Sequence, residues 1–289
     1  MTAIRMCICG SRLLCESFTN NFDAHVCTNC NSTNFIHKSD ITPPNFNYDG
    51  GDEKYSNENY LYGSEMRWAH HQLLKLNWSD RRVLEIGCFN GFFLKELELV
   101  GAKPYGHDLN NRAIKVGEDL FGLKGVLSTS LNLLRDLGPY SDVLCVDILE
   151  HLDDPKLFLK EMSDFLDRDG KIYISGPTIE RKFHDKSDYP PHHKWWFSRK
   201  GLELCLKQCG YRVVDIKIQR NGALMFRNFI GCMLSGFSKK EFYGNGVTFS
   251  NKNIVIKSIY RILDVFGISI FTLLGIEYCS SLIIAERIE

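Results

Sequence analysis

The chain has 289 residues, of which 44% are hydrophobic, which is enough for a full α/β core and a small additional unit. Lys+Arg and Asp+Glu both number 35, so the charge balance argues against nucleic acid as the partner. Residues 1–12 contain no apolar run that predicts a signal peptide, and charged residues interrupt the most apolar stretch, 254–276. Eleven cysteines without a secretory signal indicate a reducing compartment. The sequence therefore predicts a cytoplasmic protein.

The first predicted unit, residues 1–40, is rich in cysteine and too polar to fold on a hydrophobic core alone. Cys27-Thr-Asn-Cys30 has the spacing of a zinc knuckle, and Cys7-Ile-Cys9 is one residue shorter than the usual knuckle. The spacing predicts one structural Zn²⁺ ion held by Cys7, Cys9, Cys27 and Cys30, with Cys15 or His25 as substitute ligands. Reactive thiols, or thiols that are merely buried, are the alternative to a metal site.

A linker is expected over residues 41–64, which contain Pro43-Pro44 and many Asn, Asp and Tyr residues. Helical structure is expected to begin near Glu65, at the start of a main domain over residues 65–289.

From residue 80 onward, strand-like and helix-like patterns alternate. Strands are expected at 82–87, 103–108, 141–147, 170–176, 211–219 and 280–286. Helices are expected at 91–100, 110–121, 155–167 and 199–209. This alternation predicts an α/β fold with a doubly wound, mostly parallel sheet, whose ligand lies beyond the carboxyl ends of the strands.

The turn after the first of these strands, Gly87-Cys-Phe-Asn-Gly91, allows close approach of a ligand to the backbone. Its glycines are not in the G-x-G-x-x-G register of a dinucleotide site, and it has no Lys-Ser/Thr pair of a phosphate loop. Asp108 ends the next strand, where a carboxylate can accept both hydroxyls of a ribose. A ribose acceptor without phosphate-binding machinery favours a nucleoside that carries an amino acid.

"VLEIGCFNG", "YGHDLN" and "SDVLCVDILEHLDDP" resemble the successive motifs of class I S-adenosylmethionine-dependent methyltransferases. "FLDRDGKIYISGP" and "HHKWWFSRKGLELCLKQCGYRVVDI" continue the resemblance over about residues 80–220, and "SSLIIAERI" resembles the last strand. Phe89 departs from the pattern, because many members have a second glycine there. The cysteine-rich start is similar to bacterial members in which a zinc-ribbon-like unit precedes a seven-stranded, Rossmann-like domain.

The resemblance implies a role for each matching residue. Gly87 and Gly91 would form the turn under the methionine part of S-adenosylmethionine, together with Cys88, Phe89 and Asn90. Glu85 would hold the ammonium group, Asp108 the ribose, and Leu109 the adenine face. Ser130 is assigned to the adenine edge, and Asp147 to the neighbourhood of the transferred methyl group.

A hydroxyl acceptor must lose a proton during methyl transfer, and neutral histidine suits this role near pH 7. The candidates for this base are His193, His151 and His192. His151 follows the fourth strand, whereas His192 and His193 precede Trp195-Trp196 in a long polar and aromatic connection. That connection is suited to a substrate lid, and its tryptophans could stack on a sugar or base; ordinary packing is the alternative.

Residues 221–278 form an insertion before the last strand, predicted to be a helical cap over the substrate. Six Lys/Arg residues and one acid, Glu241, lie between residues 225 and 261. This basic amphipathic pattern also fits a peripheral contact with anionic lipid or a phosphorylated carrier.

The favoured function is methyl transfer to a small hydroxylated acceptor, most naturally a nucleotide- or carrier-linked sugar in polysaccharide or natural-product biosynthesis. The alternatives are an O-methyltransferase for a quinone or other aromatic lipid, since Glu150-His151-Leu152 resembles ubiquinone-pathway enzymes, and a non-catalytic scaffold that binds the cofactor.

Overall fold

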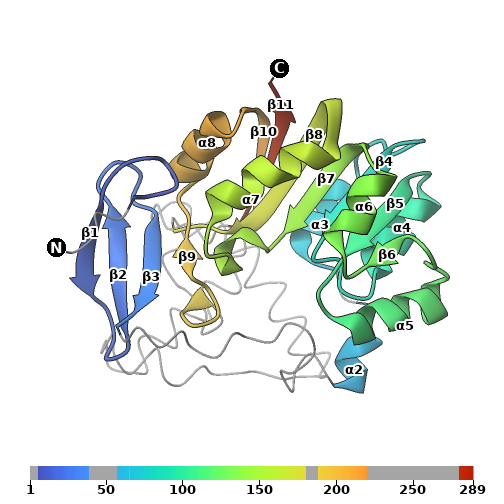
Figure 1. Cartoon of the computed structure of the whole chain (residues 1–289), viewed down its shortest axis with the longest axis horizontal. Coiled ribbons are helices and arrows are strands. Elements are labelled where there is room, and N and C mark those ends of the chain that lie inside the picture. Colours follow the sequence, from blue (N-terminus) through green and yellow to red (C-terminus); the bar gives the residue numbers. More distant parts are fainter. Residues whose placement is uncertain (1–5, 39–56, 65, 180–187, 220–279, 289) are drawn as a thin grey trace, which may run out of the picture.

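The computed structural model describes residues 6–38, 57–64, 66–179, 188–219 and 280–288. They form a seven-stranded sheet and a four-stranded sheet that lie beside each other (Figure 1). The larger sheet has the strand order β10-β11-β8-β7-β4-β5-β6. Its strands are β4 (Arg82–Ile86), β5 (Lys103–His107), β6 (Leu127–Ser128), β7 (Tyr140–Val146), β8 (Leu166–Pro177), β10 (Tyr211–Ile218) and β11 (Ser280–Arg287).

Strands β4 to β8 are parallel, and β11 runs antiparallel to both of its neighbours, β8 and β10. The chain starts at β4 and moves outward through β5 and β6. It then returns to the other side of β4 as β7. The strand order therefore reverses at β4, and a ligand is expected at the carboxyl ends of β4, β5 and β7.

Helices cover both faces of this sheet, as in a doubly wound fold. Apolar residues of α3 (Trp68–Leu73), α4 (Phe92–Leu99) and α5 (Asn111–Phe121) pack on one face. Those of α6 (Leu131–Leu137), α7 (Pro155–Met162) and α8 (Arg199–Gln208) pack on the other. The α/β class and mostly parallel sheet expected from the sequence are confirmed.

The smaller sheet has the order β1-β2-β3-β9. Strands β1 (Leu13–Ser17), β2 (Phe22–Cys27) and β3 (Thr33–His37) follow one another along the chain and pair antiparallel. The fourth strand, β9 (Trp195–Trp196), comes from the connection between β8 and α8, about 160 residues later, and pairs antiparallel with β3.

Three details depart from the sequence expectations or add to them. Helix α7 ends at Met162 rather than near residue 167, because a 3₁₀ turn (η2, Ser163–Phe165) leads directly into β8. A short helix, α2 (Glu58–Leu61), lies within the expected linker, and Asn57 caps its start. A further 3₁₀ turn, η1 (Leu149–His151), follows β7.

The insertion at 221–278, with its predicted helical cap and basic surface at 225–261, lies outside the described residues. Among the residues that the structure does describe, none belongs to a helix long and apolar enough to cross a membrane.

Candidate functional site

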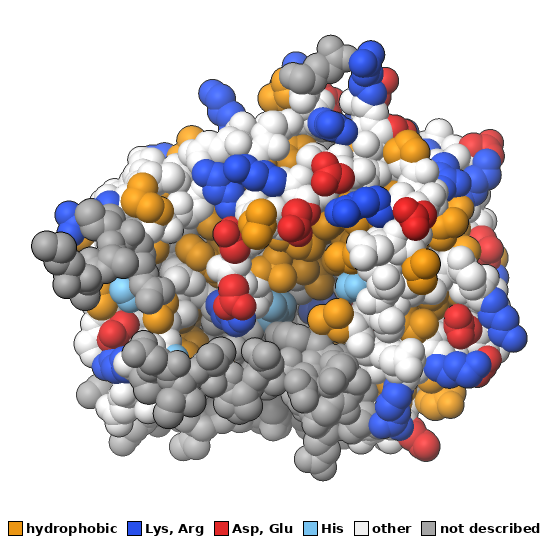
Figure 2. All heavy atoms as spheres, in the orientation of Figure 1, with side chains coloured by type: hydrophobic (Ala, Val, Ile, Leu, Met, Phe, Trp, Pro, Cys, Tyr) orange, Lys and Arg blue, Asp and Glu red, His pale blue; other side chains and the backbone are white. Residues whose placement is uncertain are grey.

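A cavity of about 740 Å³ lies at the carboxyl ends of β4, β5 and β7, where the strand order reverses. The face shown in Figure 2 is hollowed near its middle, with histidine side chains in the hollow. The cavity wall includes the following residues predicted from the sequence: Glu85, Gly87, Cys88, Phe89, Asn90, Asp108, Leu109, Asp147 and His151.

The turn after β4 leaves no room for side chains at its glycines. Gly87 and Gly91 have φ angles of +76° and +73°, in the region that favours glycine. A Cβ atom at Gly87 would lie 2.2 Å from Cδ1 of Ile148. The Gly87 and Cys88 N–H groups donate to the His107 carbonyl oxygen over 2.7 and 2.9 Å, which joins the turn to the end of β5.

Asp108 is fixed at the end of β5 by two backbone donors. The Phe89 N–H donates to Oδ2 and the Asn110 N–H donates to Oδ1, each over 2.8 Å. Burial raises the pKa of Asp108, and these two donors act in the opposite direction. Since a carboxylate oxygen can accept more than one hydrogen bond, both oxygens retain acceptor capacity for ribose hydroxyls.

Glu85, in the interior of the sheet, is held by His70 from α3. The Arg67 N–H donates to Nδ1 of His70 over 3.2 Å, so the ring proton is on Nε2, which lies 3.1 Å from Oε1 of Glu85. Oε2 of Glu85 is buried and has no hydrogen-bond partner among the described residues. A ligand ammonium group in the cavity would supply the missing donor, so the chemistry of this pair fits the cofactor.

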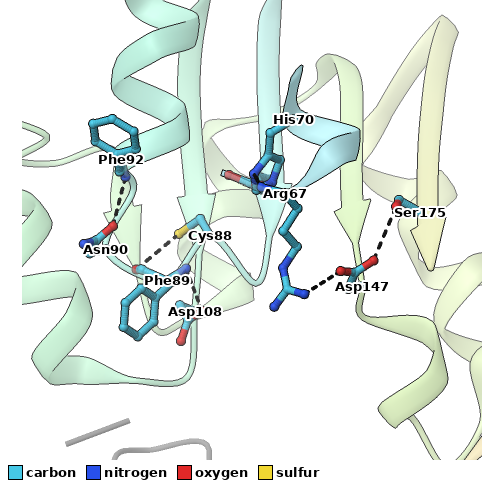
Figure 3. Close-up of polar contacts among 10 residues, drawn as sticks. Arg67, His70, Cys88, Phe89, Asn90, Phe92, Asp108, Asp147 and Ser175 are labelled. Carbon is cyan, nitrogen blue, oxygen red and sulfur yellow. Dashed lines mark hydrogen bonds and ion pairs between the residues drawn. The ribbon is translucent and has the colours of Figure 1, made fainter. Parts of the chain in front are cut away.

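Asp147 follows β7 with a left-handed φ of +54°. Nη1 of Arg67 reaches across the cavity to Oδ2 of Asp147 over 2.6 Å, and Ser175 Oγ donates to Oδ1 over 3.3 Å (Figure 3). The contact places a guanidinium, a suitable partner for a ligand carboxylate, beside Asp147 in the cavity wall.

The Asn90 side chain has structural partners. Its Nδ2 donates to the carbonyl oxygens of Leu61 and Gly63 over 2.8 and 2.9 Å, and its Oδ1 accepts from the Phe92 N–H over 3.1 Å. Asn90 thereby ties the segment around α2 to the glycine turn. This closes one side of the cavity, where Tyr60 also packs edge-on against Phe89 with ring centroids 4.9 Å apart.

The three candidate histidines lie together. Nδ1 of His151 is 2.7 Å from the backbone carbonyl oxygen of His192, and the rings of His151 and His193 meet edge-to-face with centroids 4.8 Å apart. Because a carbonyl oxygen only accepts, His151 carries its proton on Nδ1, and Nε2 holds the lone pair in the neutral ring. Burial lowers the pKa of His151, which favours that neutral form.

Glu150, next to His151, is 1% exposed. Neither carboxylate oxygen of Glu150 has a hydrogen-bond partner among the described residues. Burial and the nearby Asp147 raise its pKa well above the ordinary value. Glu150, His151 and His193 each offer one ligand atom within 4.8 Å of the others, a set that could hold a metal ion.

The four predicted zinc ligands converge in the smaller unit. The Sγ atoms of Cys7 and Cys30 are 3.6 Å apart and those of Cys9 and Cys27 are 3.5 Å apart, with all four within 4.8 Å of one another. Four thiolates at about 2.3 Å from a tetrahedral zinc would be separated by about 3.8 Å, so the cluster fits the ion. Cys15 is exposed on β1 and is not part of the cluster.

Other predicted residues lie outside the cavity wall. Gly91 precedes α4, and Ser130 precedes α6, whose first residue, Leu131, lines the cavity instead. His192 and His193 do not line the cavity themselves but contact His151, which does. Trp195 stacks on Phe197, and Trp196 packs edge-on against Phe35 of β3. Arg67 and His70 were not expected, because no strand-end motif marks the segment that precedes β4.

Comparison with known proteins agrees with this geometry. A family described as "Methyltransferase domain" matches residues 60–216, more than half of the chain. The chain therefore belongs to this methyltransferase family, and its motifs and strand order are those of the class I, S-adenosylmethionine-dependent type.

Two relatives are named ubiquinone biosynthesis O-methyltransferase. The one from Cupriavidus pinatubonensis is 27% identical over 122 residues, which cover 37% of this chain and 48% of the relative. The one from Marinobacter nauticus is 31% identical over 124 residues, covering 37% and 51%. The chain spans about half the length of these relatives.

A solved structure of a phosphoethanolamine N-methyltransferase from Haemonchus contortus is 13% identical to the chain and has a TM-score of 0.51. The match covers 96% of this chain and 71% of that one, and it indicates a shared fold.

Proposed function

We propose that this protein transfers the methyl group of S-adenosylmethionine to a hydroxyl oxygen of a small acceptor, with His151 as the general base. The observation that carries this proposal is the hydrogen bond from His151 Nδ1 to the His192 carbonyl oxygen, which puts the lone pair of the neutral ring on Nε2 in a residue that lines the cavity. A base that is neutral and oriented can take the hydroxyl proton as the oxygen attacks.

The cofactor supplies a methyl group that is already activated on a sulfonium. The chain binds and orients it: Asp108 accepts from the ribose, Oε2 of Glu85 accepts from the ammonium, and Arg67 pairs with the carboxylate. Phe89, Leu109 and the segment around α2 cover the adenosine side and exclude water from the reacting atoms.

The acceptor proposed first is a phenolic hydroxyl of an aromatic or quinone-type molecule. The names of the two relatives support this class, and so does the acidity of a phenolic hydroxyl. A phenol ionises near pH 10, whereas an aliphatic alcohol is a weaker acid, so a histidine of lowered pKa removes a phenolic proton more readily. A nucleotide- or carrier-linked sugar, favoured by the cysteine-rich start, is the second candidate.

We also propose that Cys7, Cys9, Cys27 and Cys30 hold one structural zinc ion. The support is the spacing of the four sulfur atoms. Four protein ligands leave no open position on the ion, so its role is to stabilise a unit with little apolar core of its own.

The test measures release of S-adenosylhomocysteine from S-adenosylmethionine with a panel of polyprenylated phenols and nucleotide-linked sugars. Turnover on a phenol is expected. Turnover on sugars alone would reverse the order of the two candidates, and no turnover on any member would favour the scaffold alternative.

His151→Asn tests the base. An Asn side chain can keep the donor to the His192 carbonyl while removing the ring nitrogen that takes the proton. Turnover is expected to fall by about 100- to 10,000-fold with the dissociation constant of S-adenosylmethionine within about twofold of wild type. His71→Asn, on the exposed side of α3, is the matched control. Normal turnover in His151→Asn would exclude this base.

A further inference from the structure

The residues beside the catalytic candidates belong to the smaller sheet. Strand β9, which starts two residues after His193, pairs with β3 through Thr33↔Trp196 and Asn34↔Trp195. The Phe35 N–H and the Asn34 side-chain amide both donate to the Lys194 carbonyl, over 2.8 and 3.1 Å. The segment 192–196 is therefore an edge of the cysteine-bearing sheet, as Figure 1 also shows.

The same segment contacts the methyltransferase site from its other side. The Lys194 N–H donates to the Glu150 carbonyl oxygen over 2.8 Å, and the His192 carbonyl oxygen accepts a hydrogen bond from His151 Nδ1. Residues 192–194 are thus clamped between β3 and the turn η1. A shift of β3 would be transmitted to the atom that orients His151.

Ser32 connects this clamp to the cysteine cluster. The Ser32 side chain is fully buried, and its Oγ accepts from the Ser198 N–H over 2.9 Å while lying 3.3 Å from Cys30 Sγ and 3.2 Å from Ser198 Oγ. A Cβ atom added at Gly201, in the first turn of α8, would lie 2.3 Å from Ser32 Oγ, so nothing larger than glycine fits against it.

The number of available protons decides which atom donates in the contact between Ser32 Oγ and Cys30 Sγ when a metal is bound. A zinc-bound Cys30 thiolate has no proton and can only accept, so the single Ser32 hydroxyl proton goes to sulfur. The Ser32 oxygen is then oriented to accept from Ser198, which caps α8 through its own Oγ and the Gly201 N–H over 2.9 Å. Outer contacts of this kind commonly orient the ligands of a metal site.

A second contact supports the same connection. The Gln208 side-chain amide, at the end of α8, donates to the Cys9 carbonyl over 2.8 Å. The buried cysteines, Trp195, Phe197 and Leu202 also belong to one continuous hydrophobic core. The cysteine unit is therefore packed into the methyltransferase domain at both ends of α8.

We propose that the metal-loaded cysteine unit is a positioning element of the active site: through Ser32 and the pairing of β3 with β9, it holds the 192–194 segment that orients His151. The proposal rests on the zinc site and the base proposed above. It predicts that loss of the metal loosens this segment and leaves the cofactor contacts at Glu85 and Asp108 intact.

The experiment compares wild type, Ser32→Ala and Ser17→Ala as full-length protein. Ser17 lies on β1 of the same sheet, where it pairs with Asp23 of β2 and its exposed hydroxyl accepts a hydrogen bond from Lys38. Elemental analysis gives the zinc content, calorimetry gives the affinity for S-adenosylmethionine, and amide hydrogen exchange by NMR reports on Phe35, Lys194 and Ser198.

In Ser32→Ala, exchange at these amides is expected to be about five- to tenfold faster, which corresponds to one lost hydrogen bond. Exchange at Leu144 in β7, the zinc content and the cofactor affinity should stay at wild-type values. Chelation of zinc from wild type should accelerate the same amides. A general loss of folding would instead accelerate Leu144 to the same extent as these amides.

Unchanged exchange at Lys194 and Ser198 both in Ser32→Ala and after chelation would overturn the proposal. If Ser32→Ala does not fold, Asn34→Ala replaces it, because that change removes only one side-chain donor to the Lys194 carbonyl. Ser32→Ala could speed up exchange at these amides alone even though the purified protein contains no zinc. That result would refute the zinc site and would still support positioning of the 192–194 segment by the cysteine unit. Loss of turnover in His151→Asn tests the base separately.

Discussion

At the scale of single residues, the proposed cofactor site contains one carboxylate, Asp108, that the backbone has already oriented. Asp108 accepts from the Phe89 and Asn110 N–H groups, so in its proposed role it would need no rearrangement to bind a ribose. This preorganisation lowers the entropic cost of binding, because the carboxylate does not lose further rotational freedom.

Asp108→Ala should weaken binding of S-adenosylmethionine by about 1–3 kcal/mol, through loss of charge-assisted hydrogen bonds to ribose. Calorimetry measures the change. Asp119→Ala is the control, since Asp119 lies exposed on α5 and pairs only with Lys115 among the ion pairs of the described residues. If Asp108→Ala bound S-adenosylmethionine with wild-type affinity, Asp108 would not be a cofactor-binding residue.

The proposed role of His151 as the base sets the expected pH dependence of turnover, because this histidine is partly buried. Burial lowers the pKa of this histidine, the positive charges of Arg67 and His192 add to that effect, and Asp147 and the His192 carbonyl oppose it. The base is lost only when the pH falls through this lowered pKa. The acidic limb of the kcat profile should therefore lie below the ordinary histidine value of about 6.5.

A profile measured from pH 4.5 to 9 with the best acceptor of the panel checks this expectation. An acidic limb above pH 6.5 would point to a different group, and His151→Asn should lack the limb altogether.

At the scale of elements, the glycine turn is the part of the site that tolerates least change. Gly87→Ala would place a methyl group 2.2 Å from Ile148 and would strain the backbone at φ +76°. Gly122→Ala is a matched control, because Gly122 has φ +73° and no atom within 4 Å of an added Cβ.

Both variants should lose about 1–2 kcal/mol of unfolding free energy from the left-handed backbone. Only Gly87→Ala should lose more than this and also bind S-adenosylmethionine more weakly. Chemical denaturation and calorimetry separate the two effects. An equal loss of unfolding free energy in the two variants would show that Ile148 can move away from the added methyl group without destabilising the fold.

The sequence predicts the elements around this turn well, because β4 and β7 contain apolar runs and each of β4, β5 and β7 is followed directly by a glycine or an acid. It does not predict β9, since the Trp195–Trp196 strand is only two residues long and its partner β3 lies about 160 residues away. The pairing depends on tertiary packing rather than on local propensity. Arg67 and His70 escape prediction for the same reason: their roles appear only when α3 lies against β4.

At the scale of the whole molecule, the smaller sheet shares the hydrophobic core that lies on one face of the larger sheet. Cys7, Cys27 and Leu13 of the smaller unit cluster with Leu202 and Leu206 of α8. Cysteine spacing predicts the four ligands, whereas this packing against α8 has no local sequence signal. The division into a unit at 1–40, a linker at 41–64 and a domain from 65 therefore stays a prediction about folding, because the contacts cross its boundary.

The zinc ion should accordingly stabilise more than the cysteine unit. Purified protein is expected to contain about one zinc per chain, and Cys27→Ser should lose it because only three thiolates remain. Since the cluster packs on α8, thermal unfolding monitored by helical circular dichroism should shift to lower temperature in Cys27→Ser. Cys15→Ser, an exposed change on β1, should keep both the zinc and the melting temperature of wild type. Zinc retained in Cys27→Ser but lost in Cys15→Ser would mean that Cys15 is a ligand and that the four buried sulfur atoms are not the site. A normal melting temperature in zinc-free Cys27→Ser would show instead that the shared core is stable without the metal.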